Sequence, residues 1–87
     1  MLELNIFGER LRKLRKERGL VMTDIAGLLD ISTTQVNDLE KGKTGTSLQR
    51  LVILAEFYRV STDYLLGITD DPAWRGEPTG QHPKASF

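Results

Sequence analysis

The side chains best suited to recognition chemistry lie together just after Ser32. Hydroxyl, amide and carboxylate groups crowd a run of six residues, at Thr33, Thr34, Gln35, Asn37 and Asp38. Val36 and Leu39 interrupt the polar run with the spacing of a helix side that packs inward. The polar side chains are therefore left for the outward face of a short helix.

A second short helix is expected immediately before this one. Its apolar residues have the helical spacing of a core-facing stripe, at Ile25, Ala26, Leu28 and Leu29. Between the two helices, Asp30 tolerates a left-handed backbone and Ser32 is a good N-cap, because its hydroxyl accepts a bond from a free backbone N–H. Two short helices joined by a tight turn, the second with a polar face, make a candidate helix-turn-helix.

The rest of the chain predicts an all-α fold, a compact five-helix domain over residues 1–67. The helices are expected at about 6–18, 23–29, 33–41, 48–58 and 62–66. We expect Asn5, Ser47 and Ser61 to act as N-caps, and Gly19 and Gly42 to end helices. The apolar residues of the fourth helix are available for burial: Leu48, Leu51, Val52, Leu54, Ala55 and Tyr58.

Residues 68–87 have a different composition and read as a tail, flexible or engaged in dimer contacts. All three prolines of the chain, Pro72, Pro78 and Pro83, lie here. Trp74 is the residue that could tie this segment down, and two alternatives are open: it docks on the domain or a partner chain, or it is an exposed aromatic.

Charge and cysteine content exclude several classes of protein. The 87 residues carry 12 basic and 12 acidic side chains and no cysteine, which excludes disulfides and thiolate metal sites. No apolar run is long enough to cross a bilayer and no signal peptide is visible, so a cytoplasmic protein with no membrane association is expected. The basic residues of segment 10–18, among them Arg12, Lys13 and Lys16, are expected to set the local electrostatic field.

No catalytic, metal or cofactor site is expected. His82 is the only histidine and lies beside Pro83. The segment Gly42-Lys-Thr-Gly45 lacks the upstream glycine of a phosphate-binding loop and does not follow a strand. Asp70 and Asp71 are read as solvated charges, so an enzyme is not expected.

The whole pattern resembles the phage-repressor and Cro-like helix-turn-helix family, also called the xenobiotic-response-element family. The resemblance covers residues 6–67 and rests on Phe7-Gly-Glu-Arg-Leu-Arg-Lys-Leu-Arg-Lys-Glu-Arg-Gly-Leu20, Ile25-Ala26, Leu29, Ile31-Ser32, Val36, Leu39-Glu40-Lys-Gly-Lys43, Ser47-Leu48, Leu51, Leu54-Ala55 and Val60-Ser-Thr-Asp-Tyr-Leu-Leu-Gly67. It implies a sequence-specific transcriptional regulator, a repressor, whose third helix lies in the major groove of double-stranded DNA.

The resemblance also implies roles for individual residues. Thr33, Thr34 and Asp38 fall where the family reads bases, with Gln35 and Asn37 beside them. Threonine hydroxyls can serve either base edge and their methyl groups suit the thymine methyl. Phosphate contacts are expected from Thr23, Lys41, Lys43 and Arg50, and a structural ion pair from Arg15 and Glu40.

The sequence departs from the family pattern at three places. Val21 and Met22 stand where a hydroxyl residue and glutamine are usual, so the cap of the second helix is expected to shift to Thr23. Asp38 places a carboxylate on the groove-facing side, and Thr46 replaces a usual proline.

Few cations near the presumed groove imply weak binding by a monomer. A homodimer on a palindromic operator would compensate, because two tethered weak contacts act at high effective concentration. The alternative is a protein-interaction module on the same fold, such as an antitoxin or an anti-repressor partner, with Val21 and Met22 contributing an apolar patch for a protein partner.

Overall fold

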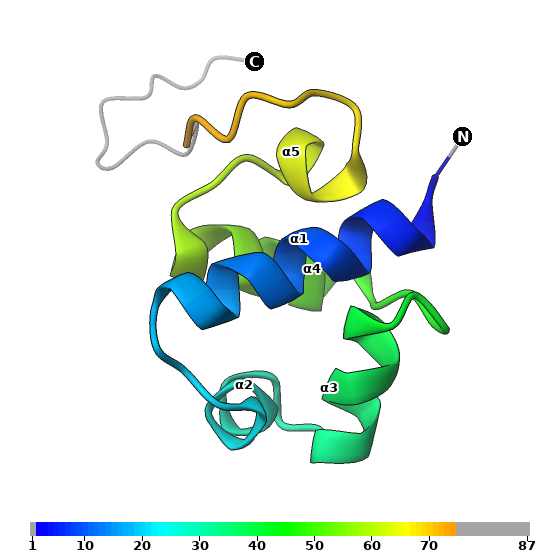
Figure 1. The fold of residues 1–87 in the computed structure, drawn as a ribbon, viewed down its shortest axis with the longest axis vertical. Helices are drawn as coiled ribbons and strands as arrows, with labels where there is room; N and C mark the ends of the chain where they lie inside the picture. The colour runs from blue at the N-terminus through cyan, green and yellow to red at the C-terminus, as the bar shows by residue number, and fades with distance from the viewer. Residues whose placement is uncertain (1, 75–87) are drawn as a thin grey trace.

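Five helices form the part of the chain that the computed structural model describes, residues 2–74 (Figure 1). They are α1 (Leu4–Glu17), α2 (Met22–Leu29), α3 (Thr33–Glu40), α4 (Leu48–Tyr58) and α5 (Thr62–Leu66), with no strand among the described residues. Figure 1 shows α1 and α4 across the middle of the molecule, with α2 and α3 at one end and α5 at the other. The predicted all-α, five-helix fold is confirmed.

The helix boundaries follow the local chemistry of serine and glycine. Ser32, Ser47 and Ser61 each accept a hydrogen bond from the backbone N–H three residues on, as N-caps do. Gly19 and Gly42 follow the ends of α1 and α3 with φ of 68° and 75°, in the left-handed region where glycine is unstrained. The expected caps and glycine stops at these positions are confirmed.

Two expected helix starts are wrong. α1 begins at Leu4 with Glu3 in the N-cap position, so Asn5 lies inside the first turn. α2 begins at Met22 and not at Thr23, with Val21 in the N-cap position. The carboxylate of Asp24 accepts a bond of 2.9 Å from the Val21 N–H, and this acid stabilises the start of α2 without a capping hydroxyl.

Side chains from all five helices form a single core. Its buried members are Phe7, Leu11, Leu14, Ile25, Ala26, Leu29, Val36, Leu39, Leu51, Leu54, Ala55, Tyr58, Val60, Tyr64 and Leu65. The burial expected of the whole apolar set of α4 is wrong for two residues, because Leu48 and Val52 are 81% and 47% exposed.

The backbone of α1 lies close to the C-terminal end of α3 at Gly8. A Cβ atom at this position would lie 2.5 Å from the carbonyl oxygen of Glu40 and 2.6 Å from that of Leu39. Only glycine therefore allows the backbone of α1 to pass over the C-terminal end of α3. This contact fixes the position of α3 relative to the rest of the core.

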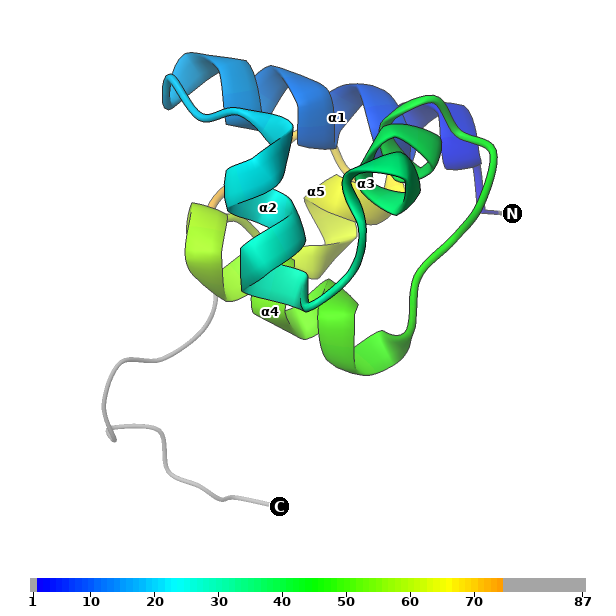
Figure 2. The same cartoon turned by 90° about the horizontal axis from the view of Figure 1, so that it is seen from below.

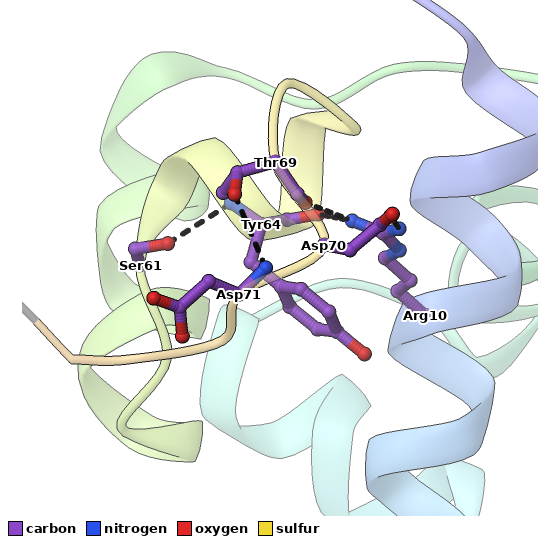
Figure 3. Close-up of polar contacts among 6 residues, drawn as sticks. All are labelled: Arg10, Ser61, Tyr64, Thr69, Asp70 and Asp71. Atoms are coloured by element: carbon purple, nitrogen blue, oxygen red, sulfur yellow. Dashed lines mark hydrogen bonds and ion pairs between the residues drawn. The ribbon is translucent and has the colours of Figure 1, made fainter.

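The start of the segment after α5 is attached to α1 by Arg10 (Figure 3). The guanidinium of Arg10 donates to the carbonyl oxygens of Tyr64 and Thr69 and to the carboxylate of Asp70. It also lies 4.3 Å from the centre of the Tyr64 ring. Residues 68–70 are thus attached to the domain, although they were assigned to the tail.

Trp74 packs against the core and is partly buried. The guanidinium of Arg59 lies 5.8 Å from the centre of its ring. Of the two alternatives for Trp74, docking on the domain is therefore the one observed. The expectations for Pro78, His82 and Pro83 lie outside the described residues.

No helix between residues 2 and 74 has the length and hydropathy needed to span a membrane. The same residues contain no group of three or more acidic or histidine side chains placed to hold a metal ion.

Candidate nucleic-acid interface

α2 and α3 lie next to each other at the end of the molecule opposite α5, and the short turn between them is seen from below in Figure 2. Asp30 makes this turn in the left-handed conformation, with φ 58° and ψ 50°. The backbone N–H of Ile31 then bonds to the carbonyl of Ala26 and satisfies the end of α2. The chain is thereby redirected into α3 within three residues, as the sequence predicts.

The start of α3 is fixed by a complete capping box. The Ser32 hydroxyl accepts from the Gln35 N–H at 3.1 Å, and the Gln35 side-chain oxygen accepts from the Ser32 N–H at 2.9 Å. Two free donors of the first turn are thus satisfied reciprocally. The side-chain oxygen of Gln35 is occupied in this way, whereas its amide nitrogen remains available to a ligand.

The outward face of α3 is graded along the helix. Thr33, Thr34 and Gln35 are exposed, and the next turn, with Asn37 and Asp38, is partly buried. The inward residues Val36 and Leu39 lie in the core and are 1% and 4% exposed. The five side chains expected to read bases are therefore all at least partly accessible, and the three in the first turn are the exposed ones.

A buried ion pair joins α3 to α1. Arg15 donates from Nε to Glu40 Oε2 at 2.7 Å and from a terminal nitrogen to Oε1 at 3.0 Å, a bidentate arrangement. The other terminal nitrogen of Arg15 donates to the carbonyl of Leu20. The hydrogen bond to Glu40 raises the pKa of Arg15. Both side chains are consumed by this contact, so they position α3 and are not available to bases.

Two hollows flank α3, and they differ in charge. One, of about 740 Å³, lies toward α1 and is bordered by Asn37, Lys41 and Lys43 together with residues of α1. The other, of about 550 Å³, lies toward the start of α4 and is bordered by Asp38 and Arg50 among others. The first is lined by several cations, while the second is lined by one cation and one acid.

The residues expected to contact phosphate lie on both sides of α3. Lys41 and Lys43 are exposed at its C-terminal end, and Thr23 is exposed in the first turn of α2. Arg50 is partly buried because its Nε donates to the carbonyl of Leu29 at 3.1 Å. Arg50 therefore also ties α4 to the last turn of α2, a contact that the sequence did not suggest.

Arg12 and Lys16 of α1, which were not among the residues expected to contact DNA, border the larger hollow together with Lys41 and Lys43. A signal was available in their spacing. Residues 12 and 16 are four apart and share one face of a helix with residue 9. The sequence did not reveal which element this face meets.

Comparison with known proteins supports the same reading. A family model described as "Helix-turn-helix" matches residues 11–65. The HTH-type transcriptional regulator DdrOP3 of Deinococcus deserti is 50% identical over 58 residues, which are 67% of this chain and 45% of the relative. YobD of Bacillus subtilis, an uncharacterized HTH-type transcriptional regulator, is 42% identical over 77% of this chain and 60% of its own length. The chain thus spans about half the length of these relatives.

Solved structures agree on the fold. A transcriptional regulator from Listeria innocua superimposes with a TM-score of 0.68 at 38% identity, covering 70% of this chain and 57% of that one. The P22 c2 repressor, solved in complex with a synthetic operator, gives 0.66 at 26% identity, covering 70% of this chain and 92% of the repressor. With its capped α3, left-handed turn and match over residues 11–65, the chain belongs to the helix-turn-helix family of DNA-binding transcriptional regulators.

Proposed function

We propose that this domain places α3 in the major groove of an operator and represses transcription by occupying that site. A helix with its side chains is roughly 10–12 Å across and the major groove is about 12 Å wide, so α3 fits with its exposed face toward the base edges. Thr33 and Thr34 are the principal readers in this arrangement, and Asn37, Asp38 and the free amide nitrogen of Gln35 reach the flanking positions.

The observation that carries this proposal is the exposure of Thr33 and Thr34 on a helix that is fixed at both ends. The Ser32–Gln35 capping box holds the first turn, and the Arg15–Glu40 pair holds the last. Preorganised side chains lose little conformational freedom on binding. The two hydroxyls and two methyl groups can therefore discriminate base pairs, although threonine has a short side chain.

Asp38 contributes to specificity through charge. A carboxylate accepts a hydrogen bond from the amino group of cytosine and is repelled by nearby phosphate. Its position beside the hollow toward α4, where Arg50 is the nearby cation, moderates this repulsion. We therefore expect a cytosine preference at the base pair under Asp38.

The domain acts as a homodimer on a palindromic site. One copy neutralises the phosphates of a single half-site only, so it binds more weakly than a dimer. Two half-sites about one helical turn apart, read by two copies, raise the affinity without new contacts within each copy. The P22 c2 repressor, which is similar in fold, has been solved in complex with a synthetic operator, and this supports operator binding by the present domain.

Selection of bound sequences from a random duplex library tests the function directly. We expect a palindromic consensus. Thr33→Ala and Thr34→Ala should each reduce the free-energy preference for the consensus base pair at one position of every half-site by about 1–3 kcal/mol. Gln49→Ala is the matched control, because this exposed residue of α4 lies outside the reading face. The proposal fails if low-salt selection enriches no sequence.

One observation favours a second function, a module that binds another protein. Val21 is 59% exposed at the start of α2, where its N–H is already used by Asp24 and is not free for phosphate. A stoichiometric protein partner captured in the absence of DNA, and lost with Val21→Ser, would support this alternative. Two results would argue against it: duplex DNA is bound while no protein partner is captured, or a partner is captured equally well by Val21→Ser.

A further inference from the structure

We propose that the hollow between α1 and α3 is a second element of the DNA interface, which holds the phosphate backbone beside the major groove through Arg12 and Lys16. This inference rests on the proposed function and extends it from base reading to backbone binding by α1. The juxtaposition that carries it is the convergence of four cations from two elements: Arg12 and Lys16 from α1, and Lys41 and Lys43 from the end of α3.

Within the described part of the chain, the basic residues of α1 and of its C-cap, Arg18, divide into two groups. Arg10, Lys13, Arg15 and Arg18 each have a partner: Asp70, Glu17, Glu40 and the carbonyl of Tyr58, respectively. The side chains of Arg12 and Lys16 make no hydrogen bond or ion pair to any residue between 2 and 74, and both residues are exposed. Both unpaired cations border the hollow, and of the four paired ones only Arg15 does.

The periodicity of α1 explains why they share this face. Asn5, Glu9, Arg12 and Lys16 are separated by four, three and four residues, so their side chains form one stripe along the helix. All four border the hollow. The stripe offers an amide and two cations to a ligand, and Glu9 is the one acid that opposes an anion.

The charge of the hollow favours an anion despite Glu9. Arg15 and Glu40 also border it, but they neutralise each other through their bidentate pair. The four unpaired cations then exceed the single free carboxylate. A protein whose net charge is zero thus concentrates positive charge beside the reading helix.

The position of the hollow identifies the anion as the DNA backbone. Asn37 borders the hollow and also lies on the reading face of α3, so the two surfaces are continuous. A helix that fills the major groove has a sugar–phosphate strand on either side. On the side of α1 that strand must pass over the hollow, within reach of the long side chains of Arg12 and Lys16. The hollow on the α4 side of α3 has Arg50 as its single cation, opposed by Asp38. The two DNA strands are therefore held by different numbers of cations.

The salt dependence of operator binding tests this inference. Each phosphate contact contributes about 0.9 to the slope of log affinity against log salt concentration. We expect Lys16→Gln to lower the magnitude of the slope by about 0.9 for each bound protomer and the double variant Arg12→Gln/Lys16→Gln by about twice that, with the selected consensus unchanged. Lys13→Gln is the matched control, since Lys13 lies on the same helix but pairs with Glu17.

Phosphate ethylation interference adds a readout of position. The wild-type protein should show interference at backbone positions flanking the bases read by α3, and the double variant should lose the outer of these positions while Lys13→Gln retains it. Urea denaturation of each variant checks that the exposed substitutions leave the fold intact.

Three results would overturn the inference. Unchanged slopes and interference in the double variant would remove the backbone role of α1 and leave the proposed function standing. Equal losses in Lys13→Gln and Lys16→Gln would show a general field effect and not a contact in the hollow. Absence of DNA binding by the wild-type protein would remove the proposed function and this inference together.

Discussion

Two arginines of α1 hold the two ends of the molecule, and they do so in different environments. Arg15 joins Glu40 at 2.7 Å beside the reading helix, and Arg10 joins Asp70 at 2.6 Å on the segment after α5. The bond lengths are nearly equal, but the Glu40 side chain is 4% exposed and the Asp70 side chain 98%. Solvent, and not distance, therefore distinguishes the two pairs.

The difference shows how firmly each end is attached. Breaking a buried pair strands a charge away from water, whereas an exposed pair exchanges its partner for water at little cost. Arg10 moreover keeps its bonds to two backbone carbonyls if Asp70 is lost. The α3 end should therefore unfold only with the whole domain, while the segment at residues 68–74 should be separable from it.

Removing the charge of Glu40 should have the largest effect. Glu40→Gln leaves the Arg15 guanidinium buried without a counter-charge, and we expect a loss of about 3–5 kcal/mol in the free energy of unfolding. Urea denaturation followed by far-ultraviolet circular dichroism measures it. The double variant Arg15→Met/Glu40→Leu should recover most of this loss, because apolar side chains can fill the same volume. A loss in Glu40→Gln below about 1 kcal/mol would contradict the distinction between the two ends.

Alkaline pH should lower the free energy of unfolding through Tyr58, which is influenced by the buried Arg15–Glu40 pair. Burial, aided by the Glu40 carboxylate, raises the pKa of Tyr58 to about 12. Since the native state favours the neutral phenol, its contribution is fully present below pH 10 and is lost as the pH rises from 10 to about 12. A shift of this size corresponds to roughly 2–3 kcal/mol.

Denaturation at pH 9 and pH 12 measures this contribution. The decrease in unfolding free energy over this interval should be smaller in Tyr58→Phe than in the wild type. An equal decrease in the two proteins would show that other groups cause the alkaline weakening.

A methyl group at Gly8 should disturb the contact between α1 and α3 more moderately. The added carbon would overlap two backbone carbonyl oxygens, which cannot rotate away, so we expect Gly8→Ala to destabilise by about 1–3 kcal/mol. Gly27→Ala in α2 is the matched control. Apart from its chain neighbours and the backbone of its own helix, no atom lies within 4 Å of the added carbon, so this substitution should stabilise by up to about 1 kcal/mol through helix propensity. Equal effects of the two substitutions would mean that the close approach at Gly8 is relaxed in solution.

Loss of the exposed pair should have the smallest effect. We expect Asp70→Asn to leave the free energy of unfolding unchanged within the error of urea denaturation, since water replaces the carboxylate at Arg10. The single tryptophan, Trp74, reports on the segment itself, and its fluorescence should show any local release. A loss of unfolding free energy in Asp70→Asn as large as that in Glu40→Gln would show that the exposed and buried ion pairs do not differ in strength.

Local sequence signals predicted much of the fold because they act within one or two turns. Ser32 caps α3, Asp30 adopts the left-handed turn, and Gly42 ends α3, each through bonds to residues a few positions away. The start of α2 was misplaced because Asp24, three residues on, replaces a capping hydroxyl at Val21. Such reciprocal caps are local, but they leave a weaker signal than serine or threonine.

The candidate site was predicted in part, and the limit is again one of distance along the chain. The outward face of α3 follows from helical periodicity, so Thr33 and Thr34 could be identified as exposed from sequence. The bond from Arg50 to the carbonyl of Leu29 joins residues 21 positions apart, and no pattern in either segment indicated it.

The sequence by itself determined that five helices form, where α3, α4 and α5 begin, and which side of α3 is polar and faces outward, because these depend on near neighbours. The tertiary structure alone decided that Gly8 meets the carbonyls of α3 and that Arg12 and Lys16 stand beside Lys41 and Lys43. The physical reason is that charges and close contacts act through space, so their partners are fixed only when the core has packed.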